Sequence, residues 1–126
     1  MSKGYQEWIR QADYDFKTAK FMFKGGRYFY TVFMCHLAIE KILKSLFYKK
    51  LKEFPPKTHS LIYLVNKIDI HPPEKIGRFL IKIDQASVVT RYPEDLARLQ
   101  KDYTKGVVEK ILLQTQGTIR WAKTIL

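Results

Sequence analysis

The stretch FMCHLAIEKILKSLF, residues 33–47, decides the fold because it reads as a helix with apolar residues around most of its circumference. A helix that is apolar on several faces has to contact neighbours on several sides. The sequence therefore predicts that this segment is the central helix of a helical bundle. Two titratable residues, His36 and Glu40, interrupt the apolar run one helical turn apart.

The segments on either side of this helix have defined ends. Residues 5–23 carry an apolar residue at alternating steps of four and three, which predicts a helix of about 20 residues. Gly25-Gly26 ends that helix and supplies a tight connection. The central helix then begins at residue 27 or 28 and ends before Pro55-Pro56, because proline cannot continue a helix.

The second half of the chain predicts a short helix, a medium helix and a long last helix. The Thr58 hydroxyl is the expected N-cap of the short helix, whose apolar residues lie within 61–68. Residues 76–86 have the spacing of the next helix, residues 88–103 predict an irregular or partly turned stretch, and residues 108–126 form the last apolar face. The prediction is an all-α, up-and-down bundle of four to five helices in a single domain, residues 1–126.

Composition limits the class of protein. Hydrophobic residues make up 46% of the chain and 14% of it is aromatic, which excludes disorder. The net charge of +11 favours nucleic acid or phosphorylated ligands, although a lysine-rich surface that only keeps the protein soluble is the open alternative. The single cysteine, Cys35, gives no sign of an oxidising compartment. With no expected signal peptide or membrane-spanning segment, we predict a cytoplasmic protein.

His36 and Glu40 are the first candidate site residues. They point to the same side of the central helix, and a buried carboxylate needs a partner because its desolvation is costly. The nearest partners are His36 itself, by a shared hydrogen bond, or Lys44 one turn further on. One interpretation is a polar pair that only fixes the register of the helix. The other is a pocket at one end of the bundle, since buried titratable groups are typical of sites. Metal binding by His36, Glu40 and His59 is disfavoured, because no dense cluster of ligands follows.

Two loop motifs add candidates. In PPKTHSL, Lys57 and His59 lie beside a helix N-terminus, where free N–H groups can hold a phosphate. In TRYPED, Arg91 suits a phosphate or carboxylate, and Tyr92, held out of the helical region by Pro93, offers a ring for a base. Ordinary capping and a packed turn are the alternatives for the two motifs.

Five motifs in this order resemble the HEPN family: A-x-x-D-F-x-x-A at 12–19, the aromatic start of the central helix, H-L-A-I-E-K-x-L-K at 36–44, K-T-H-S-L at 57–61 and T-R-Y-P at 90–93. The resemblance covers essentially the whole chain. It implies a small helical bundle, commonly a homodimer, that is often encoded beside a minimal nucleotidyltransferase and acts as toxin or substrate-binding partner.

The function expected from this resemblance is a nucleotide-binding or partner-binding module, without a cofactor or catalytic residues of its own. Several HEPN branches are metal-independent ribonucleases that use an Arg followed four to six residues later by a His, and this spacing is missing here. An RNA-cleaving toxin and a ligand-free dimeric adaptor remain alternatives. The expected ligand-binding residues, all polar, are His36, Glu40, Lys41, Lys44, Lys57, His59, Arg91 and Tyr92. Phe21, Met22 and Met34 lie off the predicted core faces, so we expect them to face a second copy.

Overall fold

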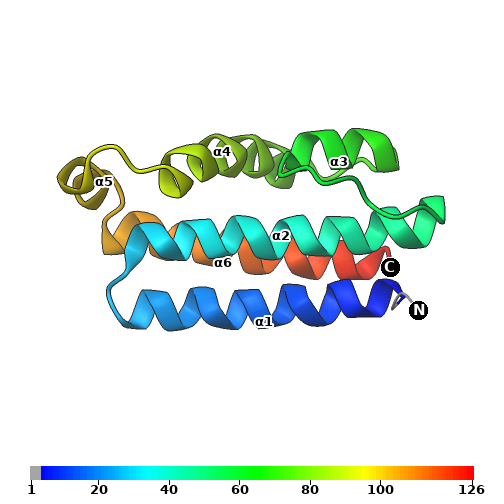
Figure 1. The fold of residues 1–126 in the computed structure, drawn as a ribbon, viewed down its shortest axis with the longest axis horizontal. Helices are drawn as coiled ribbons and strands as arrows, with labels where there is room; N and C mark the ends of the chain where they lie inside the picture. Colours follow the sequence, from blue (N-terminus) through cyan, green and yellow to red (C-terminus); the bar gives the residue numbers. More distant parts are fainter. Residues whose placement is uncertain (1–3) are drawn as a thin grey trace.

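Four long helices run alternately up and down in the computed structural model, which describes residues 4–126 (Figure 1). The long helices are α1 (Tyr5–Lys24), α2 (Tyr28–Leu51), α4 (Glu74–Arg91) and α6 (Lys105–Thr124). The short helices are α3 (Leu61–Ile68) and α5 (Leu96–Asp102). The colours of Figure 1 show that α1 and α4 run opposite to α2 and α6. The all-α, up-and-down architecture predicted from the sequence is therefore confirmed.

Helix α2 is the centre of the bundle, as its sequence predicts. It contacts all five other helices, and fourteen of its 24 residues are buried. Helix α1 lies along one side of α2 and the layer formed by α3, α4 and α5 lies along the other (Figure 1). The start of α1 and the C-terminus lie at the end of the bundle where α2 also ends. Because α2 meets both layers, polar residues buried on it are held from several directions.

The connection between α1 and α2 is the tight turn expected from Gly25-Gly26. Gly26 has a φ of +75°, a left-handed conformation that side chains with a Cβ atom rarely adopt. The N–H groups of Gly25 and Gly26 donate to the carbonyl groups of Phe21 and Phe23, which satisfies the end of α1. Gly26 therefore lets two long helices pack as antiparallel neighbours.

The number of helices is larger than the four to five expected. Helix α4 continues through residues 88–90 to Arg91, and α5 replaces the irregular stretch expected over residues 88–103. Pro93 does hold Tyr92 outside the helical region, at φ −124° and ψ 69°. A new helix then starts because the Asp95 side chain accepts a hydrogen bond from the Arg98 N–H, and this cap allows seven residues to form α5.

Two local expectations are also corrected. The N-cap of α3 is Ser60, whose hydroxyl accepts from the Tyr63 N–H, whereas the Thr58 hydroxyl accepts from the Ser60 N–H and so orders the approach to the helix. Met34 is partly buried and packs against the core, so it is not a free surface residue, while Phe21 is 74% exposed. Among residues 4–126, no helix is long and apolar enough to cross a membrane.

Candidate functional site

A row of polar side chains lies on α2 where α4 and the N-terminus of α3 cover it. His36 is fully buried, and its Nε2 is 2.9 Å from the Asp84 Oδ1 of α4. Asp84 also accepts from the Leu61 and Ile62 N–H groups, which are the first free donors of α3. One carboxylate therefore joins α2, α4 and α3.

These contacts shift the pKa of Asp84. Burial by itself raises the pKa of this carboxyl group, but the hydrogen bonds from His36, Leu61 and Ile62 stabilise the charged form, and the net result is a pKa below the ordinary value of 3.8. Asp84 is therefore ionised at neutral pH. The place at the start of α3 where the sequence suggested a phosphate is filled by this carboxylate, so those N–H groups are already satisfied.

Glu40 is the second polar centre of the row. Its Oε2 is 3.0 Å from the Lys44 Nζ, and its Oε1 is 2.9 Å from the Nδ1 of His59, which lies on the loop before α3. Glu40 and Lys44 are buried, whereas 61% of the His59 side chain is exposed. The hydrogen bond between His36 and Glu40 that the sequence allowed is not formed, because Asp84 and His59 offer each of them a partner from another segment.

The other expected site residues lie around this row. Lys41 forms an ion pair of 2.9 Å with Asp15 of α1, on another side of α2. The Arg91 guanidinium lies 4.8 Å from the centre of the Phe33 ring, one turn before His36. Tyr92 is 71% exposed. Lys57 is exposed two residues before His59. The structure thus brings His36, Glu40, Lys44 and His59 together where α3 and α4 cover α2, whereas Lys41, Lys57, Arg91 and Tyr92 lie apart from them.

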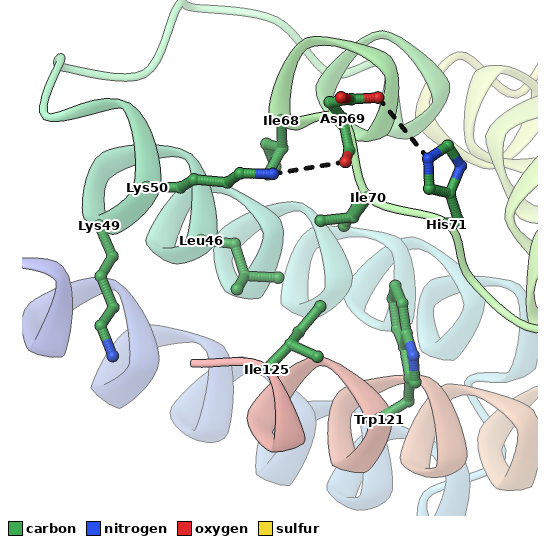
Figure 2. Close-up of a pocket in the computed structure, with 9 residues that line it drawn as sticks. All are labelled: Leu46, Lys49, Lys50, Ile68, Asp69, Ile70, His71, Trp121 and Ile125. Atoms are coloured by element: carbon green, nitrogen blue, oxygen red, sulfur yellow. Dashed lines mark hydrogen bonds and ion pairs between the residues drawn. The ribbon is translucent and has the colours of Figure 1, made fainter.

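A cavity lined by apolar, aromatic and basic residues, as ligand sites often are, lies at the end of the bundle that holds the C-terminus (Figure 2). It has a volume of about 490 Å³ and lies between the end of α2, the segment after α3 and the end of α6. Its apolar wall includes Leu46, Ile68, Ile70 and Ile125. Trp121 of α6 adds a half-buried aromatic ring on the side opposite Ile70 (Figure 2). Cavities of this size hold small molecules.

Two lysines, a histidine and Asp69 line the rim of this cavity. Lys49 and Lys50 come from the last turn of α2 and His71 comes from the segment after α3. The Lys50 Nζ is 3.4 Å from the Asp69 carbonyl oxygen, and the His71 Nε2 is 3.7 Å from an Asp69 carboxylate oxygen (Figure 2). The Lys49 Nζ also lies 4.9 Å from the centre of the Tyr5 ring of α1. An aromatic ring and two lysines on the lining of one cavity suit a ligand that has both a flat apolar part and a negative charge.

Other chemistry is disfavoured by the described residues. Burial raises the pKa of the Cys35 thiol to about 12, although a hydrogen bond with Thr115 opposes this, so the thiol stays protonated and unreactive. Between residues 4 and 126, no group of three or more His, Cys, Asp or Glu side chains has positions suited to a metal ion. The row on α2 is therefore characterised by ion pairing and the exposed imidazole of His59, and the cavity by an aromatic ring, lysines and the exposed imidazole of His71.

The sequence patterns did not identify the residues that complete the polar row on α2 and the cavity beside Trp121. Residue type and spacing do not mark Asp84 as a site residue, although it lies four residues after Leu80 in a helix whose apolar residues predict a buried face. The sequence does not indicate Trp121 and His71 as site residues either. They line one cavity with Lys49 and Lys50 only because three separate segments pack together. A carboxylate next to an apolar stripe was the one signal present in the sequence.

The fold and the buried polar row define an all-helical domain of the kind that the sequence motifs suggested. The model of the HEPN domain matches residues 5–125, so the chain belongs to the HEPN family. Two solved structures share the fold at 24% identity. TT1696 from Thermus thermophilus has a TM-score of 0.82, covering 97% of this chain and 98% of its own. ST0689, an archaeal HEPN homologue, has a TM-score of 0.78, covering 98% of each chain. A comparison with curated proteins gave no match.

Proposed function

We propose that this protein is a nucleotide-binding module that works with a nucleotidyltransferase, and that the cavity beside Trp121 holds the nucleotide. The observation that carries the proposal is that Trp121, Lys49 and Lys50 all line one cavity of about 490 Å³. A base would stack on the indole ring, and the phosphates would lie toward the lysines. The net charge of +11 would draw such a ligand to the protein.

The expected residues on α2 support this site indirectly. His36, Glu40 and Lys44 are buried and bonded to other side chains, which favours a role in holding α3 and its preceding loop on α2. That packing positions the segment after α3, which supplies His71 to the cavity. Lys57 and His59, on the loop before α3, remain candidates for contact with the outer part of a longer ligand such as RNA. Arg91 and Tyr92 lie at the end of α4 and do not line this cavity.

A thermal shift experiment tests the nucleotide proposal. ATP or GTP at millimolar concentration should raise the melting temperature, because a ligand that binds only the native state stabilises it by mass action. The rise should disappear in Trp121→Ala and in the double variant Lys49→Glu/Lys50→Glu. Lys57→Glu is the control, because it reverses the charge of a lysine that does not line the cavity. Tripolyphosphate without a base should give a smaller rise than ATP, and an equal rise would contradict stacking on Trp121.

Association with a partner or with a second copy requires apolar surface that the packing of the bundle leaves exposed. Phe21 is 74% exposed and Tyr14, seven residues earlier on the same side of α1, is 72% exposed. We infer that this face joins two copies of the chain. Phe21→Glu should then shift the sedimentation coefficient toward that of a monomer, whereas Leu113→Glu, a matched change at a residue that is 64% exposed on α6, should not. Equal dimerisation of both variants would place the interface elsewhere.

A ribonuclease is the second candidate function, and one observation favours it. The exposed His59 ring is oriented by the buried Glu40, which leaves Nε2 free to act on a ligand. A positioned imidazole is what acid–base cleavage of RNA requires. Purified protein should then cleave labelled RNA, and His59→Ala should abolish the cleavage while His71→Ala retains it. Cleavage by all three proteins to the same extent would exclude His59.

A further inference from the structure

A second hollow of about 690 Å³ lies between the last turns of α4 and helix α5. These two elements meet at the end of the bundle opposite the C-terminus (Figure 1). Its apolar side is formed by Val88, Val89 and Tyr92, which are 60%, 46% and 71% exposed. Ile81, 53% exposed, lies seven residues before Val88 and so on the same face of α4. These exposed apolar side chains are spread along about 16 Å of helix, with the polar Gln85 between Ile81 and Val88.

The polar side of this hollow has the opposite charge to the rest of the protein. Glu94, Asp95 and Asp102 line it, and Arg98 is the one lining cation. Arg98 lies 3.8 Å from an Asp102 carboxylate oxygen, so its charge is offset locally. The hollow is thus net negative, with three carboxylates against one guanidinium, in a chain with a net charge of +11.

These charges exclude two kinds of occupant. A nucleotide or an RNA strand would bring phosphates against Glu94, Asp95 and Asp102, and like charges repel. A second copy joined through the same surface by a two-fold axis would bring these carboxylates against their own equivalents. The occupant that fits is apolar on one face and positively charged beside it.

We propose that the groove between α4 and α5 is a docking site for a basic amphipathic helix of a partner protein. The ridge formed by Ile81, Val88 and Tyr92 has helical spacing, and a helix of about three turns matches its length. Leucine-type side chains of the partner would cover Val88 and Tyr92. Lysine or arginine side chains would meet Glu94 and Asp102. This inference deepens the partner part of the proposed function and is independent of nucleotide binding at Trp121.

A labelled synthetic peptide tests this site directly. The probe is a helical peptide of leucine and lysine with apolar residues on one face, and its matched control replaces each lysine with glutamate. Fluorescence anisotropy should show that the protein binds the lysine peptide and not the glutamate peptide. Binding of a cationic peptide by a protein of charge +11 requires a local negative surface, so the sign of the result is informative.

Two variants locate the binding. Glu94→Lys and Val88→Ser/Tyr92→Ser should each weaken the affinity by about tenfold or more. Glu53→Lys, an exposed residue after α2 at the other end of the bundle, and Leu113→Ser should change it by less than about twofold. Each substituted side chain is exposed, and circular dichroism melts verify the fold. The ATP thermal shift should be unchanged in the groove variants, which separates failure of this site from failure of the nucleotide proposal.

Three results would overturn the inference. In the first, the lysine peptide does not bind the wild-type protein. In the second, both groove variants bind the peptide as tightly as the wild-type protein does. In the third, sedimentation shows a dimer that Val88→Ser/Tyr92→Ser disrupts, so that a second copy rather than a partner helix fills the groove.

Discussion

Glu40 has a cation on each of its two carboxylate oxygens when His59 is protonated, and it keeps Lys44 when His59 is neutral. Both Glu40 and Lys44 are buried, so neither charge is well solvated without the other. His59 adds a hydrogen bond from a loop that is 19 residues away in the chain. The buried pair therefore fixes the position of that loop rather than adding much stability.

Removing one member of this pair should be costly. Glu40→Ala leaves the Lys44 ammonium buried without a counter-charge, and we expect the free energy of unfolding to fall by about 3 kcal/mol. The double variant Glu40→Met/Lys44→Met removes both charges and should regain most of that loss, because similar apolar volume replaces the pair. Urea unfolding followed by circular dichroism measures both values. A double variant as unstable as Glu40→Ala would show that the pair is not the unit that matters.

Asp84 makes stability depend on acid pH. Its pKa is lowered in the folded protein, so its stabilising contribution is complete above the unfolded value near pH 4 and is lost as pH falls through the lower folded value. Asp84→Asn should destabilise the protein at pH 7 and make the fall in stability below about pH 4 shallower. Urea midpoints from about pH 2 to 7 test this, and curves that stay parallel for the two proteins would contradict it.

At the scale of elements, the helices that could be predicted are those whose apolar pattern is long. The stripe of residues 5–23 and the apolar run of residues 33–47 predicted α1 and the centre of α2 correctly. Helix α5 was missed because seven residues are too few for a period, and its existence depends on the Asp95 cap. The N-cap of α3 was misplaced because Thr58 and Ser60 are equally good caps by residue type, and the contact of Asp84 with Leu61 and Ile62 decides between them.

The turn between α1 and α2 gives a test at this scale. Gly26→Ala should lower the free energy of unfolding by about 1 to 2 kcal/mol, because alanine is strained at a φ of +75°. Gly25→Ala is the matched control, since Gly25 has a φ of −82° and an added Cβ meets only ordinary contacts. It should be neutral or slightly stabilising, through the lower entropy of the unfolded chain. Equal losses in the two variants would mean that crowding rather than conformation limits the turn.

The molecule as a whole separates its surfaces by charge. The lysine-lined cavity beside Trp121 lies at the end of the bundle that holds the C-terminus. The acidic groove between α4 and α5 lies at the other end. The net charge of +11 predicted an anionic ligand, but the sequence did not show where it would bind. The candidate row on α2 was identified from residue type and spacing. The cavity was not, because Lys50, His71 and Trp121 come from segments that only tertiary packing joins.

Tryptophan fluorescence tests the nucleotide site most directly, because the chain has two tryptophans and one of them lines the cavity. In a Trp8→Phe variant, Trp121 is the only tryptophan, and ATP stacked on its ring should quench the tryptophan emission to a saturating level. Adding Lys49→Glu/Lys50→Glu to this variant should abolish the quenching, whereas adding Lys57→Glu should leave it. Calorimetric binding of ATP with no change in Trp121 emission would place the nucleotide elsewhere. No binding by either method would contradict the account.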